Sequence, residues 1–424
     1  MADIVRGQNN RAHAMPLPLK RANLAPVRVA HRGTPRAINR QILLNLVRAW
    51  QPVSRADLAR LMGTRRGAIS LLVNDLIADG VLFEGAKGET ARGRKPKFLY
   101  IDSRNRSVIA VDVRATRTFL MVTDLLTEPV VGVSSFPTQR DPARFVKTLA
   151  ARIDRLLAEH KDLGRCEGIG LVVPGMLDST GTSLAFAPRL GWRDVPLRDW
   201  VAKATGLPVH IENSGRACAI AQVWGVRREA GRSTDFVFLS VSDGLGVGLV
   251  VDGEVVRGRH NVAGEFGHLP LDIDGPPCAC GAAGCWEAYV SNLATLSRYF
   301  GREISPRLPI PAEIASFTVE DLVARARGGD TKAMSALQET ARYLGLGLAS
   351  IVNAVDPARI FISGEIVAAW DLLEHTVRDA LATRVLAPAA SSIAITPVPA
   401  PDHPRLRGAA ALVTAPLFAT PRVG

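Results

Sequence analysis

Three cysteines lie close together in the segment CACGAAGC, at Cys278, Cys280 and Cys285, and His268 precedes them with nine residues between. Three thiolates and one imidazole make a tetrahedral ligand set that suits Zn²⁺. The glycines between them would let a short stretch of chain wrap around an ion. In a reducing compartment, a metal site explains such a cluster better than disulfides do. The spacing therefore predicts one structural zinc ion per chain, with three unrelated buried cysteines as the alternative.

Basic side chains form the second group that could do chemistry. The chain has 424 residues and a formal net charge of +12, and its first 100 residues hold 18 Lys and Arg against 6 Asp and Glu. The rest of the chain carries equal numbers of basic and acidic residues, so the whole excess belongs to the first quarter. This asymmetry indicates a polyanion-binding head on a neutral body. A solvated basic tail without a partner is the alternative.

The elements that would position these basic residues have the order of a helix-turn-helix. Apolar residues at helical spacing predict a first helix over 40–50. Ser54 and Asp57 form a near capping box for a short second helix. Thr64 is expected to cap a third helix that stops at Gly80. Helix, short helix, tight turn and helix together predict a helix-turn-helix motif.

The last helix of such a motif enters the major groove with its N-terminal residues at the base edges. Arginine is well shaped for bidentate contact with guanine. Two short strands within 81–101, around a loop rich in Gly, Lys and Arg, predict a wing that can reach the backbone or the minor groove. An interaction module with solvated charges is the alternative. The predicted DNA-binding residues are Ser54, Arg55, Thr64, Arg65, Arg66, Ser70, Arg92, Arg94 and Lys95.

We therefore divide the chain into a basic mobile arm over 1–38, a winged helix-turn-helix domain over 39–104 and a body over 105–424. The arm has scattered prolines and arginines but no apolar period. The body alternates apolar strands with helices, the pattern of an α/β fold. The segments VIAVDVRATRTFLMVTDL and FVFLSVSDGLGVGLVVDG both read as strand, turn, strand and start 128 residues apart. They indicate a duplicated, two-lobed body.

The segment AGEFGHLPLDIDGPPCACGAAGCWEAY, residues 263–289, resembles the signature of the ROK family of repressors, open reading frames and sugar kinases. SRADLARLMGTRRGAIS followed by GRKP resembles the winged helix of its repressor branch, and GIGLVVPGMLDSTG, APRLGW and NAVDPARIFISGE match in order and spacing. The resemblance implies an actin-like (ribonuclease H-like) body with a sugar site in its cleft. Lobe one would span about 105–215 plus 400–424, and lobe two about 216–399 with the zinc loop 268–287. The implied sugar contacts are Asn213, Glu265, His268 and Glu287, with His268 also ligating zinc.

The chain departs from the kinases of that family at their catalytic elements. Where the kinases carry a Gly-rich turn resembling DxGGTK, this chain places side chains at Arg114–Thr116, which hinder backbone approach to phosphate. Where the kinases have Asn-Asp, with the Asp as general base, this chain has Asn213-Ser214, and a serine of ordinary pKa is no base. The Gly244–Gly248 segment keeps its glycines but follows Asp243, which would repel phosphate. We expect no phosphotransfer.

The sequence thus predicts a sugar-responsive transcriptional regulator, most simply a repressor of carbohydrate genes. A sugar or sugar derivative would close the lobes and shift paired winged helices on a pseudo-palindromic double-stranded operator. Two-fold operator geometry implies a homodimer, and a tetramer stays open. The alternatives are an ATP-dependent sugar kinase with an appended DNA-binding domain and a regulator controlled by a protein partner. Neither a membrane-length apolar run nor a secretory signal occurs, so we expect a cytoplasmic protein.

Overall fold

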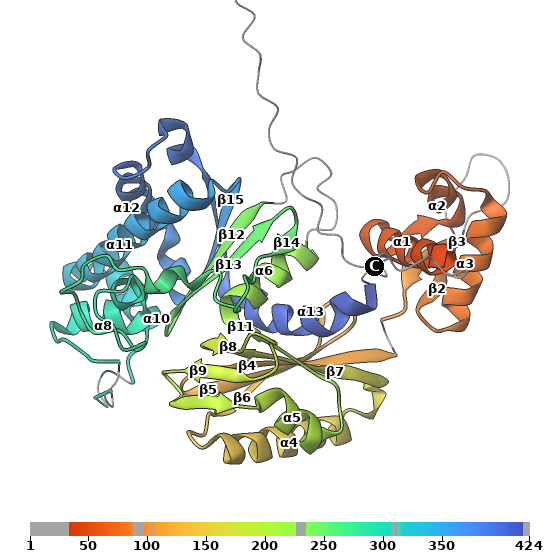
Figure 1. Ribbon diagram of the computed structural model, residues 1–424, viewed down its shortest axis with the longest axis horizontal. Coiled ribbons are helices and arrows are strands. Elements are labelled where there is room, and N and C mark those ends of the chain that lie inside the picture. The colour runs from red at the N-terminus through yellow and green to blue at the C-terminus, as the bar shows by residue number, and fades with distance from the viewer. Residues whose placement is uncertain are drawn as a thin grey trace, which may run out of the picture.

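The computed structural model describes residues 34–87, 97–103, 105–225, 235–306, 310–311, 314 and 316–418. The first part of it, which we call the head, covers residues 34–87 and 97–101 and packs three helices against a small antiparallel sheet (Figure 1). Its elements are α1 (Thr34–Trp50), β1 (Val53–Ser54), α2 (Arg55–Leu61), α3 (Arg66–Ala78), β2 (Leu82–Lys87) and β3 (Lys97–Ile101), with strand order β1-β3-β2.

The helix starts and caps agree only in part with those predicted from the sequence. Ser54 and Asp57 form the complete capping box of α2, as expected. The helix α1 begins at Thr34, so the arm predicted to extend to residue 38 ends earlier, and its first 33 residues lie outside the described residues. The residue that caps α3 is Arg65 and not Thr64, and its side chain makes no cap hydrogen bond. The start of α3 is therefore left open for other partners.

The body contains two five-stranded sheets with the same topology. Lobe one is the sheet β11-β7-β4-β5-β6, and lobe two is the sheet β16-β15-β12-β13-β14. In lobe one, β4 pairs antiparallel with β5 and parallel with β7, and β11 adds in parallel beyond β7. In lobe two, β12 pairs antiparallel with β13 and parallel with β15, and β16 adds in parallel beyond β15. The duplication that the two similar segments predict is therefore real. The strands are β4 (Arg106–Val113), β5 (Arg117–Thr123), β6 (Pro129–Pro137), β7 (Arg165–Val173), β11 (Val209–Asn213), β12 (Phe236–Val241), β13 (Leu245–Val251), β14 (Glu254–Val255), β15 (Arg359–Gly364) and β16 (Ala394–Val398).

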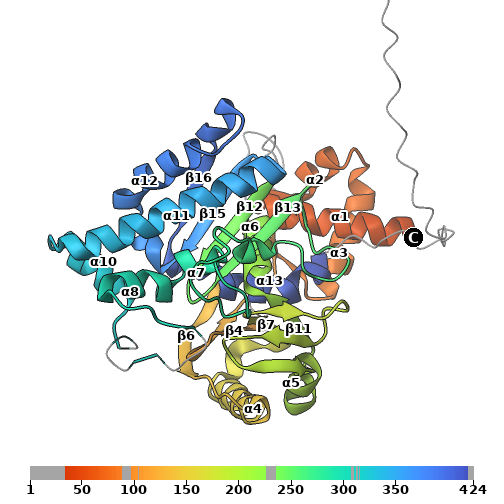
Figure 2. The same ribbon diagram turned by 60° about the vertical axis from the view of Figure 1, so that its left-hand side comes forward.

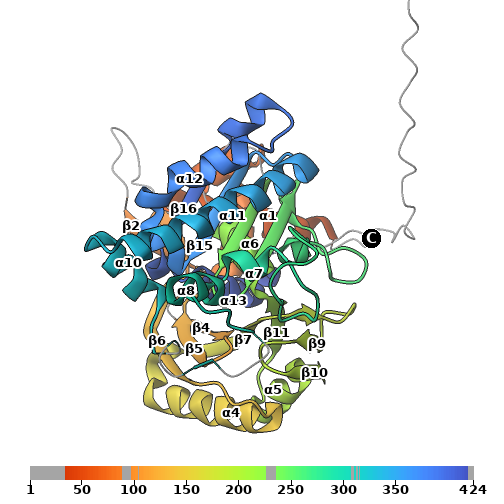
Figure 3. The ribbon, with the colours of Figure 1, turned by 90° about the vertical axis from the view of Figure 1, so that its left-hand side faces the viewer.

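Both faces of each central strand are buried because helices cover both sides. In β4, Ile109 and Val111 face the core under α4 (Pro142–Glu159) and α5 (Leu197–Thr205), while Val108 and Ala110 face α13 (Pro404–Phe418). Figure 3 shows α4 and α5 on the outer side of lobe one. Long apolar runs without alternation are what such a doubly covered strand requires.

Lobe two is covered on its outer side by α8 (Asn292–Phe300), α10 (Val319–Arg327), α11 (Thr331–Val355) and α12 (Trp370–Ala382), as Figure 2 shows. Between the two sheets lie α13 and α6 (Ser214–Gly225), packed against each other. Smaller elements are β8 (Met176–Leu177), β9 (Leu184–Ala187), β10 (Trp192–Val195) and α7 (Glu287–Val290). Among the described residues no helix combines the length and apolarity that a bilayer crossing would require.

Candidate functional site

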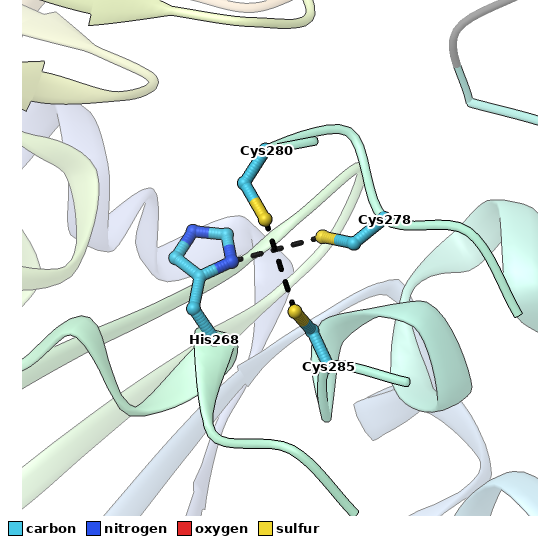
Figure 4. A group of neighbouring side chains, drawn as sticks. All are labelled: His268, Cys278, Cys280 and Cys285. Carbon is cyan, nitrogen blue, oxygen red and sulfur yellow. Dashed lines mark hydrogen bonds between the residues drawn. The ribbon is translucent and has the colours of Figure 1, made fainter. Parts of the chain in front are cut away.

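The four expected metal ligands come together in lobe two (Figure 4). His268 ends a short 3₁₀ turn, Cys278 and Cys280 lie on the following loop, and Cys285 comes just before α7. Their ligand atoms all lie within 4.8 Å of one another, with 3.8 Å between the sulfurs of Cys280 and Cys285 and 3.7 Å between Cys278 Sγ and His268 Nδ1. Ligands at about 2.3 Å from a tetrahedral centre are about 3.8 Å apart, so this donor set fits a zinc ion.

The loop that carries these ligands depends on glycine at one close approach. Gly284 has φ +66°, and a Cβ there would lie 1.4 Å from the carbonyl oxygen of Asp272. No other residue fits that backbone without moving the loop. The remaining cysteines lie apart from this group: Cys218 is fully buried in an apolar cluster, and the half-buried Cys166 packs against the core of lobe one. They are core thiols, as their apolar sequence surroundings indicate.

A pocket opens between the two lobes beside the metal ligands, and all four implied sugar contacts line it. Asn213 is the last residue of β11, Glu265 and His268 lie on the 3₁₀ turn, and Glu287 begins α7. The structure thus joins residues of both lobes, up to 74 positions apart, at one place. Ser214, at the start of α6, also lines the pocket.

The polar groups of this pocket are held in defined orientations. His268 turns Nδ1 to the cysteines, while its Nε2 lies 3.8 Å from Glu265 Oε2. Glu287 accepts a hydrogen bond from the Leu245 amide at 2.9 Å. Asn213 donates to the Gly175 carbonyl at 2.7 Å and accepts from the Gly215 amide at 2.8 Å. Burial raises the pKa of the Glu265 carboxyl, and nearby His268 partly offsets this. Oriented carboxylates and amides are suited to binding the hydroxyl groups of a sugar.

Three arginines that the sequence did not single out as ligand contacts also line the pocket: Arg114, Arg189 and Arg405. Arg114 was noted only as a departure from a glycine turn, and Arg189 lies within the APRLGW motif. No local pattern says that these side chains meet, because they come from three separate segments of lobe one. Asp243 lines the same pocket from lobe two.

Arg114 and Arg405 are held by ion pairs and hydrogen bonds within the chain. Arg114 donates to Asp112 at 2.8 Å and to Glu365 at 3.1 Å, and so connects the lobes. Arg405 at the start of α13 donates to Ser240 Oγ at 3.0 Å and lies 3.8 Å from Asp112. The side chain at Arg114 therefore does more than replace a glycine, because its guanidinium binds the Asp112 carboxylate near the end of β4.

The glycines of the Gly244–Gly248 segment are explained by close packing. Gly246 and Gly248 lie within β13, where α6 crosses the strand. A Cβ on Gly248 would lie 2.5 Å from the Gly215 carbonyl oxygen and 2.6 Å from the Cβ of Ala219. These glycines let helix and strand approach closely, and Gly246 lines the pocket together with Gly244.

The start of α3 presents an open basic surface. Thr64, Arg65 and Arg66 are exposed, and Ser70 is half-buried one turn further on. Ser54 and Arg55 both make contacts within the head. Ser54 is 5% exposed and caps α2. Arg55 donates to Glu84 at 2.9 Å and to the Asn74 side chain at 2.9 Å, which ties α2 to α3 and β2. The assignment of Ser54 and Arg55 as DNA contacts stays a prediction. Arg92, Arg94 and Lys95 lie outside the described residues.

The head is joined to the body by a contact that the sequence did not suggest. Arg48 of α1 donates to the Trp224 carbonyl at 3.0 Å, and its guanidinium lies 4.0 Å from the centre of the Trp224 ring. Asn45 donates to the Phe418 carbonyl at 2.7 Å, and Gln41 to the Leu417 carbonyl at 2.9 Å. Trp224 and Phe418 pack edge to face and belong to the apolar core of the head.

This contact lies at the far ends of the two helices that begin at the pocket. Ser214 starts α6 and Arg405 lies in the first turn of α13, and both line the pocket, while Trp224 and Phe418 are at the opposite ends. Figure 1 shows α13 running from between the sheets to α1. A 12-residue helix spans about 18 Å. The pocket and the head are thus connected by two rigid elements.

Comparison with known proteins decides the family. The family model described as "ROK family" matches residues 108–415, which is most of the chain. The chain belongs to the ROK family. Its body is accordingly the actin-like α/β fold of ROK proteins.

Among its ROK relatives, the xylose repressor of Bacillus spizizenii is 27% identical over 363 residues, which cover 85% of this chain and 90% of the repressor. A glucokinase of Halalkalibacterium halodurans is 30% identical over 283 residues, covering 65% of this chain and 84% of the kinase. A crystal structure of a ROK family transcriptional regulator, described as a homologue of the Escherichia coli MLC protein, superposes with a TM-score of 0.73 at 25% identity and covers 91% of this chain and 97% of that chain. The repressor matches extend into the head, whereas the kinase match is no longer than the body.

Proposed function

We propose that this protein is a sugar-responsive, DNA-binding transcriptional repressor without kinase activity. The observation that carries the proposal is the continuity between pocket and head: α6 and α13 start at a pocket suited to sugar hydroxyls and end on α1 of the basic head. A ligand that favours one arrangement of the lobes would shift these helix ends and so change the placement of the head. The relatives named as repressors support the same function.

The head is a winged helix-turn-helix in this proposal. Its α3 lies in the major groove, with Arg65 and Arg66 at base edges or phosphates and Thr64 and Ser70 beside them. The N-terminal arm and the loop with Arg92, Arg94 and Lys95 add phosphate contacts that carry no sequence information. The chain acts as a homodimer, because a pseudo-palindromic operator offers two equal half-sites.

In the effector site, Asn213, Glu265, His268 and Glu287 bind the hydroxyl groups of the sugar. One zinc ion per chain, held by His268, Cys278, Cys280 and Cys285, fixes the orientation of His268 and of the loop that ends at Glu287. Zinc has a structural task here, since four protein ligands fill a tetrahedral coordination sphere.

Phosphotransfer is absent for two reasons in the chain itself. Ser214 offers no general base at the position where the kinases hold an aspartate. The Arg114 guanidinium, bound to Asp112 and Glu365, places a charged side chain beside the first strand, where the kinases have glycines that let a nucleotide phosphate approach the backbone. Binding energy from the sugar is then available for moving the lobes rather than for chemistry.

The experiment that tests this function has two stages. A thermal-shift screen with neutral and charged sugars on the full chain identifies a ligand, because binding to the folded state raises the melting temperature. The same ligand is then titrated into the complex of the protein with an operator selected from random DNA. A ligand that changes operator affinity at least fivefold is expected. Stabilisation by no sugar, together with capture of a protein partner that changes operator affinity, would contradict the proposal, as would sugar-dependent ATP turnover above the enzyme-free rate.

A further inference from the structure

Arg189 is the one arginine of the pocket lining that makes no hydrogen bond among the described residues. It lies on the turn between β9 and β10 of lobe one, and its side chain is 14% exposed. Its Nε is buried and has no hydrogen-bond partner. The nearest carboxylate oxygen, Glu287 Oε1, is 3.7 Å from Nη2, which makes an ion pair but is too far for a hydrogen bond.

The surrounding groups cannot supply what Arg189 lacks, because they are committed elsewhere. Glu287 uses Oε2 to accept from the Leu245 amide, and its Oε1 also faces Cys278 Sγ at 3.8 Å. The other two arginines of the pocket, in contrast, both donate to partners of the chain: Arg114 to carboxylates and Arg405 to a serine hydroxyl.

A largely buried guanidinium without hydrogen bonds is costly unless a ligand completes it. Its planar fork of donors matches the two oxygens of a carboxylate or phosphate and forms charge-assisted hydrogen bonds with them. A neutral sugar can accept from such a fork through two neighbouring hydroxyls, but these hydrogen bonds lack the charge of the acceptor. The unsatisfied donors therefore favour an anionic group over a neutral one.

We propose that the effector is a sugar that carries an anionic oxygen group, either a carboxylate or a phosphate, and that Arg189 binds this group. The inference rests on the proposed function, since it concerns the same pocket. Arg189 reaches from lobe one toward lobe two: a Cβ on Gly244 would lie 3.8 Å from its Nε and 2.7 Å from Glu287 Oε2. The anion is thus held at the boundary of the lobes, where its binding draws them together.

The test is titration calorimetry on the full chain with matched sets of probes. Glucose, galactose, mannose and xylose are each compared with their uronic or aldonic acid and with their terminal phosphate. At least one anionic sugar is expected to bind ten times more tightly than its neutral parent, and whether it is the acid or the phosphate identifies the anion. Arg189→Met should weaken that binding about 10- to 100-fold and leave the neutral parent unchanged, while Arg189→Lys should restore part of the loss.

Arg198→Met is the matched control, because Arg198 lies in the first turn of α5 in the same lobe, pairs with the exposed Asp199 at 2.8 Å and does not line the pocket. It should bind every probe like the unchanged protein. A neutral sugar that binds as tightly as its anionic partners would overturn this inference and leave the sugar-responsive function standing. An Arg189→Met variant that is merely less stable, with the preference for the anionic sugar unchanged, would overturn it as well. Binding of none of the probes would overturn both.

Discussion

Arg48→Ala should uncouple the pocket from the head. The substitution removes the hydrogen bond to the Trp224 carbonyl at 3.0 Å and the stacking of the guanidinium 4.0 Å above the Trp224 ring. Trp224 lies in the last turn of α6, whose first residue lines the pocket. Arg48 therefore binds the far end of a helix that begins at the pocket. The side chain lies far from the pocket and from the exposed start of α3, which leaves the two binding sites themselves intact.

The size of the effect follows from these two contacts. A hydrogen bond from a charged donor contributes about 1.5–3 kcal/mol, and a cation–π contact at a half-buried site about 0.5–2 kcal/mol. Only the part that differs between the ligand-bound and ligand-free states enters the coupling. If about 2 kcal/mol of the contact is lost in one state, the factor by which the effector changes operator affinity falls about thirtyfold. Typical coupling free energies are about 1–3 kcal/mol, so this loss would remove most of the response.

Fluorescence anisotropy with labelled operator, at fixed salt and with and without effector, measures that factor directly. For Arg48→Ala we expect a factor near one, with effector affinity by calorimetry within twofold of the unchanged protein. Arg36→Ala is the control: it removes the same charge from the same helix, but Arg36 pairs with Asp75 of α3 and not with the body. Its response to effector should be intact. A full response in Arg48→Ala would refute the assignment of this contact as the connection.

Three further outcomes follow from the geometry. Cys280→Ser should lower the zinc content measured by atomic absorption to well below one per chain and lower the melting temperature, whereas Cys166→Ser should keep the metal; a zinc content that stays at one per chain in Cys280→Ser would contradict the ligand set. Arg65→Ala should weaken operator binding by about 1–3 kcal/mol if Arg65 reads a base, and operator affinity should fall steeply with salt; a salt-independent affinity would argue against an electrostatic head. Gly248→Ala should cost about 1–3 kcal/mol in denaturant unfolding through overpacking against α6, while Gly132→Ala, with nothing within 4 Å of the added Cβ, should cost far less; equal costs would mean that α6 is not packed tightly on β13.

The features that could be predicted from the sequence are those encoded by local or repeated patterns. The zinc ligands lie within 18 consecutive residues, so chemistry and spacing alone bring them together. The capping box of Ser54 and Asp57 is equally local. The duplicated sheets could be recognised because two central segments keep the same strand, turn, strand pattern. In each case the information lies in neighbouring residues or in a comparison of two short segments.

Contacts between distant segments could not be predicted in that way. Arg48 and Trp224 are 176 positions apart, and Asn45 and Phe418 are 373 apart, so no periodicity links them. Arg55 is a different case: its charge is visible in the sequence, but its ion pair with Glu84 is not. Among the described residues, the value of a basic side chain for binding DNA depends on which acidic side chain the fold places beside it.

The arginines at the base of the cleft explain how a kinase-type fold can work as a switch. In an enzyme of this shape the angle between the lobes must respond to two ligands, sugar and nucleotide. Here Arg114 joins Asp112 of lobe one to Glu365 of lobe two, and Arg405 on α13 binds Ser240 of lobe two. Because the chain itself supplies these links, we infer that they hold one side of the cleft and that a ligand on the effector side changes the angle between the lobes. Arg405 belongs to the helix that ends on the head, so a change of angle at the cleft acts directly on the element that carries the DNA-binding surface.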